Sequence, residues 1–103
     1  MSLPPPLGEQ MIRDALLRLL KAGGLAPQDD WVAVRRINDP SRWAGMYVVT
    51  IDRDAARVPL SRELRRVTGG AETEAMGVWV LTESEAHRLC ARAPHGAQEA
   101  DER

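Results

Sequence analysis

The feature that most constrains the fold is an apolar stretch at residues 43–52, which is rich in β-branched and aromatic side chains and is the best strand candidate in the chain. Successive side chains of a strand point to opposite faces of its sheet. One face would carry Trp43, Gly45, Tyr47, Val49 and Ile51, and the other Ala44, Met46, Val48 and Thr50. Because neither face turns polar before Asp52, we expect a central strand that needs cover on both sides.

Two further strands are predicted beside this central one. Residues 31–37 have a strand pattern and are followed by turn chemistry at residues 38–41. We therefore expect an antiparallel hairpin with a loop of about five residues between the first two strands. Residues 76–81 are apolar on both faces and form the third predicted strand.

The clearest helix is predicted at residues 8–22, where apolar side chains recur at helical spacing and two glycines follow. A last helix is predicted after Thr82, because Thr82 and Glu85 have the spacing of a capping box. Pro94 is expected to end this last helix.

A short helix is expected between the second and third strands. Residues 52–58 are polar and are interpreted as irregular, and Pro59 introduces the helix, with Ser61 as a plausible N-cap. Its small apolar stripe consists of Leu60, Leu64 and Val67. A helix this short would not shield a sheet face alone.

These elements predict an α+β domain of order α-β-β-α-β-α with a three-stranded, mostly antiparallel sheet. The first and last helices are expected to pack on one face of that sheet. Because both sheet faces are apolar in sequence, the other face would be left partly bare. We expect a homodimer or a protein partner to cover it.

Composition predicts one folded domain in a reducing compartment. The chain has 103 residues, a formal net charge of -1 and one cysteine, Cys90, so no internal disulfide can form. We expect a flexible leader at residues 1–7, a single domain at 8–93 and a flexible polar tail at 94–103. No apolar run is long enough to span a membrane, and a cytoplasmic location is expected.

No motif in the sequence predicts catalysis, and we expect a protein that is not an enzyme and has no cofactor or metal. His87 and Cys90 are three residues apart, so a cysteine–histidine dyad is conceivable. No nucleophile elbow or oxyanion-hole sequence accompanies them. A buried structural cysteine beside a solvated histidine is the preferred interpretation. One cysteine and two histidines do not form a zinc-site pattern.

The aromatic residues all fall in predicted strands and have two alternative uses. They could form a core, or they could line a pocket for a small ligand. The candidate partner-binding residues are Trp43, Tyr47 and Trp79.

Arginines are concentrated in the middle of the chain. Residues 31–70 hold eight arginines against four acidic residues. The segment 53–66 could contact phosphates, through the candidate residues Arg57, Arg62, Arg65 and Arg66. No base-reading Asn or Gln accompanies them on the short helix, so an ordinary solvated face is the preferred interpretation.

The leading interpretation is a small interaction or regulatory protein that binds another protein through an apolar sheet face. A nucleic-acid-binding regulator that uses residues 53–66 is the alternative. Small-ligand binding by the aromatic strands is the third.

Overall fold

The computed structural model describes residues 8–38, 40, 44–70, 73 and 75–93. Their order confirms the predicted α+β class. The elements are α1 (Glu9–Ala22), a 3₁₀ turn (Asp29–Trp31), β1 (Val32–Arg36), β2 (Tyr47–Ile51), α2 (Asp54–Thr68), β3 (Val78–Leu81) and α3 (Glu83–Arg92). The predictions for Trp43 and for the leader and tail lie outside the described residues.

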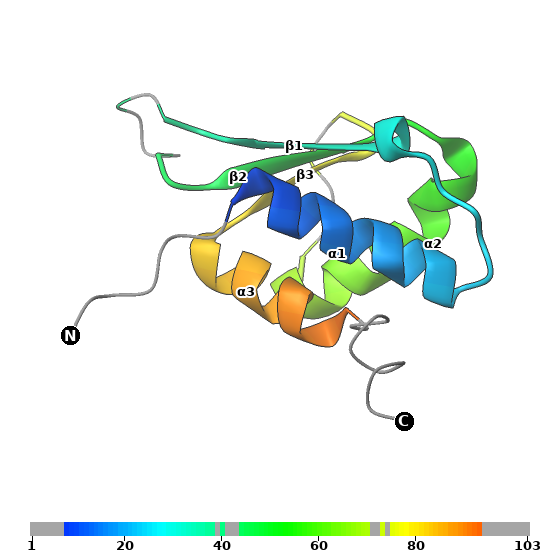
Figure 1. Ribbon diagram of the computed structural model, residues 1–103. Helices are drawn as coiled ribbons and strands as arrows, with labels where there is room; N and C mark the ends of the chain where they lie inside the picture. The colour runs from blue at the N-terminus through cyan, green and yellow to red at the C-terminus, as the bar shows by residue number, and fades with distance from the viewer. Residues whose placement is uncertain (1–7, 39, 41–43, 71–72, 74, 94–103) are drawn as a thin grey trace.

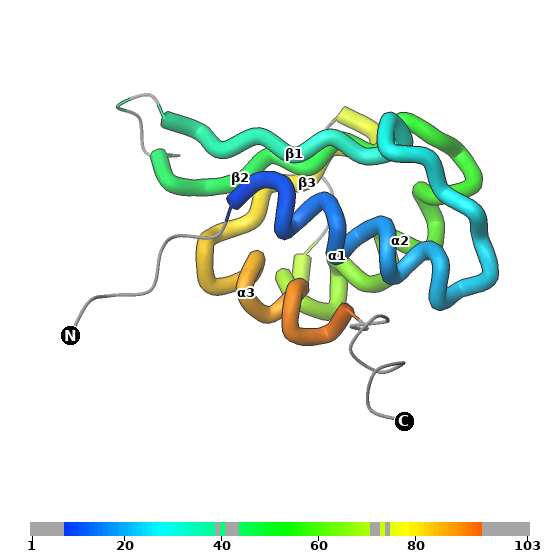
Figure 2. The backbone as a smooth tube through the Cα atoms, in the orientation of Figure 1, coloured from blue at the N-terminus to red at the C-terminus, as the bar shows by residue number. Residues whose placement is uncertain are grey.

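The fold has two layers, a sheet and a layer of helices (Figure 1). The strands are antiparallel in the order β1-β2-β3, so β2 is central as predicted. All three helices contact one another, and each packs against a strand on the same side of the sheet. Figure 2 follows the chain from β2 directly into α2 and from β3 directly into α3.

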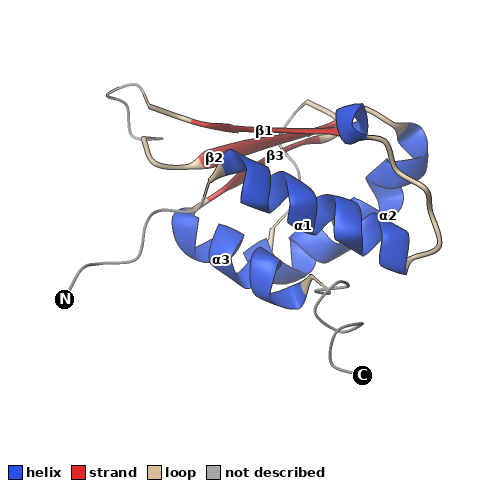
Figure 3. Cartoon of the chain, viewed as in Figure 1, coloured by secondary structure: helices blue, strands red, loops and turns tan. Residues whose placement is uncertain are grey.

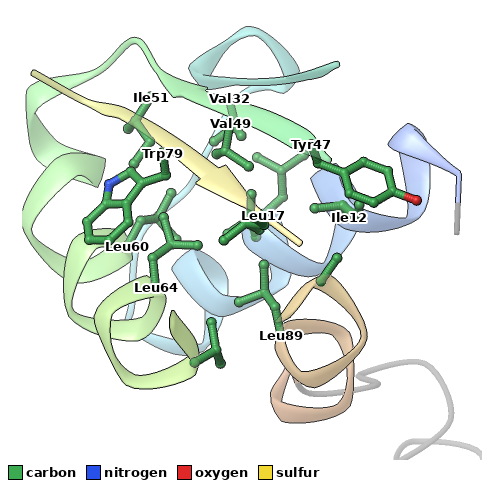
Figure 4. Close-up of a cluster of buried hydrophobic side chains, with 14 of the residues drawn as sticks. Ile12, Leu17, Val32, Tyr47, Val49, Ile51, Leu60, Leu64, Trp79 and Leu89 are labelled. Atoms are coloured by element: carbon green, nitrogen blue, oxygen red, sulfur yellow. The ribbon is translucent and has the colours of Figure 1, made fainter. Parts of the chain in front are cut away.

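The core lies between the sheet and the helices (Figure 4). The apolar stripe of α1 supplies Ile12, Leu16 and Leu20, each 0% exposed. The odd-numbered residues of β2 face this stripe. The two-residue period of the strand and the helical period of α1 therefore bring their apolar side chains into one cluster. α3 begins with the predicted capping box: the Glu85 N–H donates to the Thr82 hydroxyl, and the Thr82 N–H donates to the Glu85 carboxylate.

The middle helix is longer than predicted, and the assignment of residues 54–58 as irregular is wrong. α2 begins at Asp54 and runs through Pro59, so Ser61 lies inside it and is not an N-cap. Proline in a helix interior loses a backbone hydrogen bond and costs about 3 kcal/mol. Burial of a leucine or valine contributes roughly 1.5–3 kcal/mol, and α2 buries four side chains: Ala56, Leu60, Leu64 and Val67. The free energy gained by burying these side chains therefore outweighs the cost of placing Pro59 inside the helix.

The second and third strands begin later than the apolar stretches that predicted them. β2 starts at Tyr47, because Gly45 adopts a φ of 85° and its N–H bonds the Ile37 carbonyl at 2.9 Å. The Ile37 N–H in turn bonds the Met46 carbonyl at 2.8 Å, so the loop between the first two strands is longer than five residues. β3 likewise starts after Gly77, whose φ is 79°.

We predict that Gly77 is the glycine least able to accept a side chain. A Cβ there would lie 2.9 Å from the Ile51 carbonyl oxygen and would occupy a left-handed backbone conformation. Gly77→Ala is expected to lower the free energy of unfolding by about 2 kcal/mol or more, through both strain and overpacking.

Gly69→Ala is the matched control, since Gly69 has a φ of 71° but no atom within 4 Å of the added Cβ. Gly69→Ala should lower the free energy of unfolding by only about 1 kcal/mol, because it adds the cost of the left-handed backbone conformation without a steric contact. Urea unfolding measures both variants. Equal losses in the two would show that the contact with Ile51 is unimportant.

Candidate functional site: the open face of the sheet

None of the described helices lies on one face of the sheet (Figure 3). Exposure alternates along each strand, which places every second side chain on this face. The pairing register aligns these residues in two rows across the sheet. The rows are Ala33, Thr50 and Val78, and Arg35, Val48 and Val80. We call these six residues the open face.

The open face is mainly apolar, with a single charge. Val48 and Val80 are half-buried by their neighbours, while Ala33 and Arg35 are exposed. A shallow hollow of about 310 Å³ is lined by Ala33, Arg35, Val48 and Thr50. Arg35 lies on the edge strand β1, so the centre of the face is uncharged.

The structure places the predicted aromatic site residues elsewhere. Tyr47 is 0% and Trp79 is 1% exposed, and both side chains lie in the core on the helix side of the sheet (Figure 4). Neither ring is on the open face, so the assignment of these two residues to a partner-binding surface is corrected. Arg35 is the residue from which the open face could have been identified. Its register partner Val48 points to the same face as Arg35, whereas Tyr47 points to the opposite face.

Two arginines cover aromatic rings at the ends of the sheet. The guanidinium of Arg36 lies 5.5 Å from the ring centroid of Tyr47, and that of Arg53 lies 5.2 Å from the Trp31 ring. Both distances are typical of cation–π contacts. Burial raises the pKa of the Tyr47 hydroxyl, and the Arg36 charge partly offsets this rise. These contacts support the fold and leave no ring of this pair free for a ligand.

The candidate dyad does not form a nucleophile with a base. His87 is exposed on α3, whereas Cys90 is half-buried with its Sγ 4.0 Å from the Met11 carbonyl oxygen. Burial raises the pKa of the Cys90 thiol, although the Arg18 charge opposes this. The thiol form is therefore favoured, which is the opposite of an activated cysteine.

The candidate arginines of α2 fall into two groups. Arg57 pairs with Asp54 at 3.2 Å, and Arg66 pairs with Glu63 at 3.7 Å. Glu63 also pairs with Arg92 of α3 at 2.9 Å. Arg62 and Arg65 are exposed and have no ion pair among the described residues. Only this second group is fully available to an anionic partner.

Within the described part of the chain, no group of acidic, histidine or cysteine side chains could hold a metal ion. None of the described helices has both the length and the apolar character needed to cross a bilayer. Comparison with protein-family models, with curated proteins and with solved structures gave no match. The function must therefore be argued from the geometry.

We predict that Cys90 reacts slowly with thiol reagents. Labelling by dithionitrobenzoate at pH 8 should be at least about tenfold slower in the folded protein than in guanidinium, because burial favours the neutral thiol. Since the pKa is raised on folding, this group's contribution to stability is present below the unfolded pKa and is lost as pH rises through the folded one. Equal labelling rates would contradict the burial argument.

The nucleic-acid interpretation makes a separate prediction. If the outer face of α2 contacts phosphates, replacing both Arg62 and Arg65 by Gln should make binding less sensitive to salt. The slope of log affinity against log salt concentration should become shallower by about two. Arg66→Gln is the matched control, because Arg66 already has an acidic partner. Fluorescence anisotropy with duplex and single-stranded DNA at low salt measures this. Absence of binding there would remove the interpretation.

Proposed function

We propose that this chain is a small interaction protein that associates reversibly with a second copy of itself through the open face. The supporting observation is that the three described helices lie on the opposite side of the sheet, so none of them covers the two rows of mainly apolar side chains. A contiguous apolar patch on a protein surface often marks a site of interaction with another protein.

A second copy suits the distribution of charge on the face. A two-fold axis brings the same surface together from both subunits, so the surface must tolerate contact with itself. The centre of the open face, around Val48 and Val80, is uncharged and would meet an uncharged surface. Arg35 is on the edge strand, and so it can stay at the hydrated rim when two sheets stack.

The size of the sheet argues for weak association. A face of three strands, with strands about 4.8 Å apart and residues about 3.3 Å apart, covers on the order of 300 Å². Stable interfaces bury about 800 Å² on each partner, and smaller ones belong to transient contacts. The proposed dimer is therefore one whose population changes with concentration, as expected for a regulatory contact.

Val48→Glu tests the proposal. Val48 lies directly opposite Arg35 across the strands, so a glutamate there gains a cross-strand partner within the monomer. The same glutamate places a charge in the centre of the proposed interface. The wild-type mass measured by sedimentation equilibrium should rise from monomer towards dimer with concentration, and Val48→Glu should remain monomeric.

Val58→Glu is the matched control, because Val58 is 66% exposed on α2, away from the sheet face. It should self-associate like the wild type. A wild-type protein that stays monomeric up to millimolar concentration would overturn the proposal. Dimers that persist in Val48→Glu but are lost in Val58→Glu would also overturn it, because they would place the interface on α2.

A further inference from the structure

A second candidate surface lies at the outer edge of β1 and involves backbone groups. Trp31 and Asp52 are joined by an N–H···O bond of 2.8 Å, and so are Ile37 and Met46. Hydrogen-bonded pairs alternate along an antiparallel ladder, so Ala33 and Arg35 bond β2 through their backbones. The N–H and C=O groups of the residues between them, such as Val34, therefore point away from the sheet.

The chain already satisfies one of these outward groups with a carboxylate. The Arg36 N–H donates to the Glu9 Oε2 at 2.7 Å, across 27 positions of sequence. Glu9 thus takes the place that a carbonyl of a neighbouring strand would have. Val34, two residues earlier, has no such partner among the described residues, so its N–H and C=O remain available to another strand.

Helix and strand geometry puts Arg13 beside Val34. One helical turn advances about 5.4 Å and two strand residues advance about 6.6 Å, so the residue one turn after Glu9 lies near the level of Val34. A groove of about 490 Å³ runs between the two elements. It is lined by Gly8, Glu9, Gln10 and Arg13 of α1 and its N-cap, and by Ala33 and Val34 of β1.

Arg13 is the unsatisfied group in this groove. One of its terminal nitrogens donates to the Gln10 side-chain oxygen at 3.1 Å, but its Nε is buried and has no acceptor. No acidic side chain among the described residues forms an ion pair with it. A guanidinium in this situation favours an incoming carboxylate, because charge-assisted hydrogen bonds are the strongest available to it.

Part of the opposite edge of the sheet is already paired within the chain. On β3, the Val78 carbonyl accepts from the Thr73 N–H at 2.9 Å, and the Val78 N–H bonds the Ala75 carbonyl at 3.2 Å. The Thr82 N–H is held by the Glu85 carboxylate. The outward groups of Val78 and the Thr82 N–H are thus satisfied within the chain.

We propose that the β1 edge binds an extended peptide segment of another protein as a fourth strand, with an Asp or Glu side chain of the peptide on Arg13. The backbone of Val34 supplies the pairing, and Arg13 supplies the preference for an acidic residue. This site is separate from the open face and does not depend on the proposed dimer.

A phage-displayed library of random decapeptides, selected on the full chain, is the probe. We expect enriched peptides to share an acidic residue flanked by β-branched residues. Val34→Pro removes the outward N–H and no ladder bond, so it should weaken the selected peptides at least about tenfold. Val34→Ala keeps the N–H and controls for the smaller side chain, and binding should stay within about twofold.

Arg13→Gln should also weaken binding at least about tenfold, whereas Arg62→Gln on α2 should not change it. If Val34→Pro fails to fold, N-methylation of each peptide amide in turn gives the second measurement, and one alternate set should abolish binding. Selected peptides that bind Val34→Pro and Arg13→Gln as tightly as wild type would overturn the proposal, and so would a selection without enrichment. Val48→Glu should bind these peptides normally, which separates this site from the open face.

Discussion

The structure depends on the two-residue period of β2. Tyr47, Val49 and Ile51 are at most 5% exposed, and the three helices cover the face that these residues form. A slip of the strand register by one residue would exchange them for Val48 and Thr50 and would expose the large ring. The same period that builds the core therefore creates the open face. Core and candidate site are two sides of one strand.

The helix layer and the open face differ sharply in polarity. The outer surfaces of the helices carry ion pairs, such as the one in which Glu63 of α2 holds Arg92 of α3. Exposed pairs of this kind contribute little stability, but they keep a surface hydrated. On the open face, Arg35 is the one charged residue that can keep the surface hydrated. This contrast supports a role for the sheet in association and leaves the helices as its scaffold.

Local signals in the sequence predicted most of the fold. The alternation of β2, the stripe of α1 and the Thr82–Glu85 capping box each depend on neighbouring residues, and each was confirmed. The start of α2 was not predictable in this way. Pro59 is a local signal against a helix, and it is outweighed by burial that only the tertiary structure provides.

The candidate site was less predictable than the fold. When both faces of a strand are apolar, the strand sequence does not indicate which face the helices cover. Tyr47 and Trp79 were predicted to lie in a binding surface, but both are buried, because large aromatic rings also contribute most to a core. The β1 edge had no signal at all, because it depends on the Glu9–Arg36 contact between distant segments and on backbone groups that no side chain identifies.

The partly closed edge of β3 has a consequence for polymerisation. Sheets that expose two free edges can add strands at both sides and grow into open-ended fibres. Here the Thr73 N–H and the Ala75 carbonyl occupy the outward groups of Val78, which disfavours strand addition on the side of β3. Edge-to-edge assembly through two β1 edges would leave the partly closed β3 edges outside. Such a pairing would disfavour open-ended growth along the sheet.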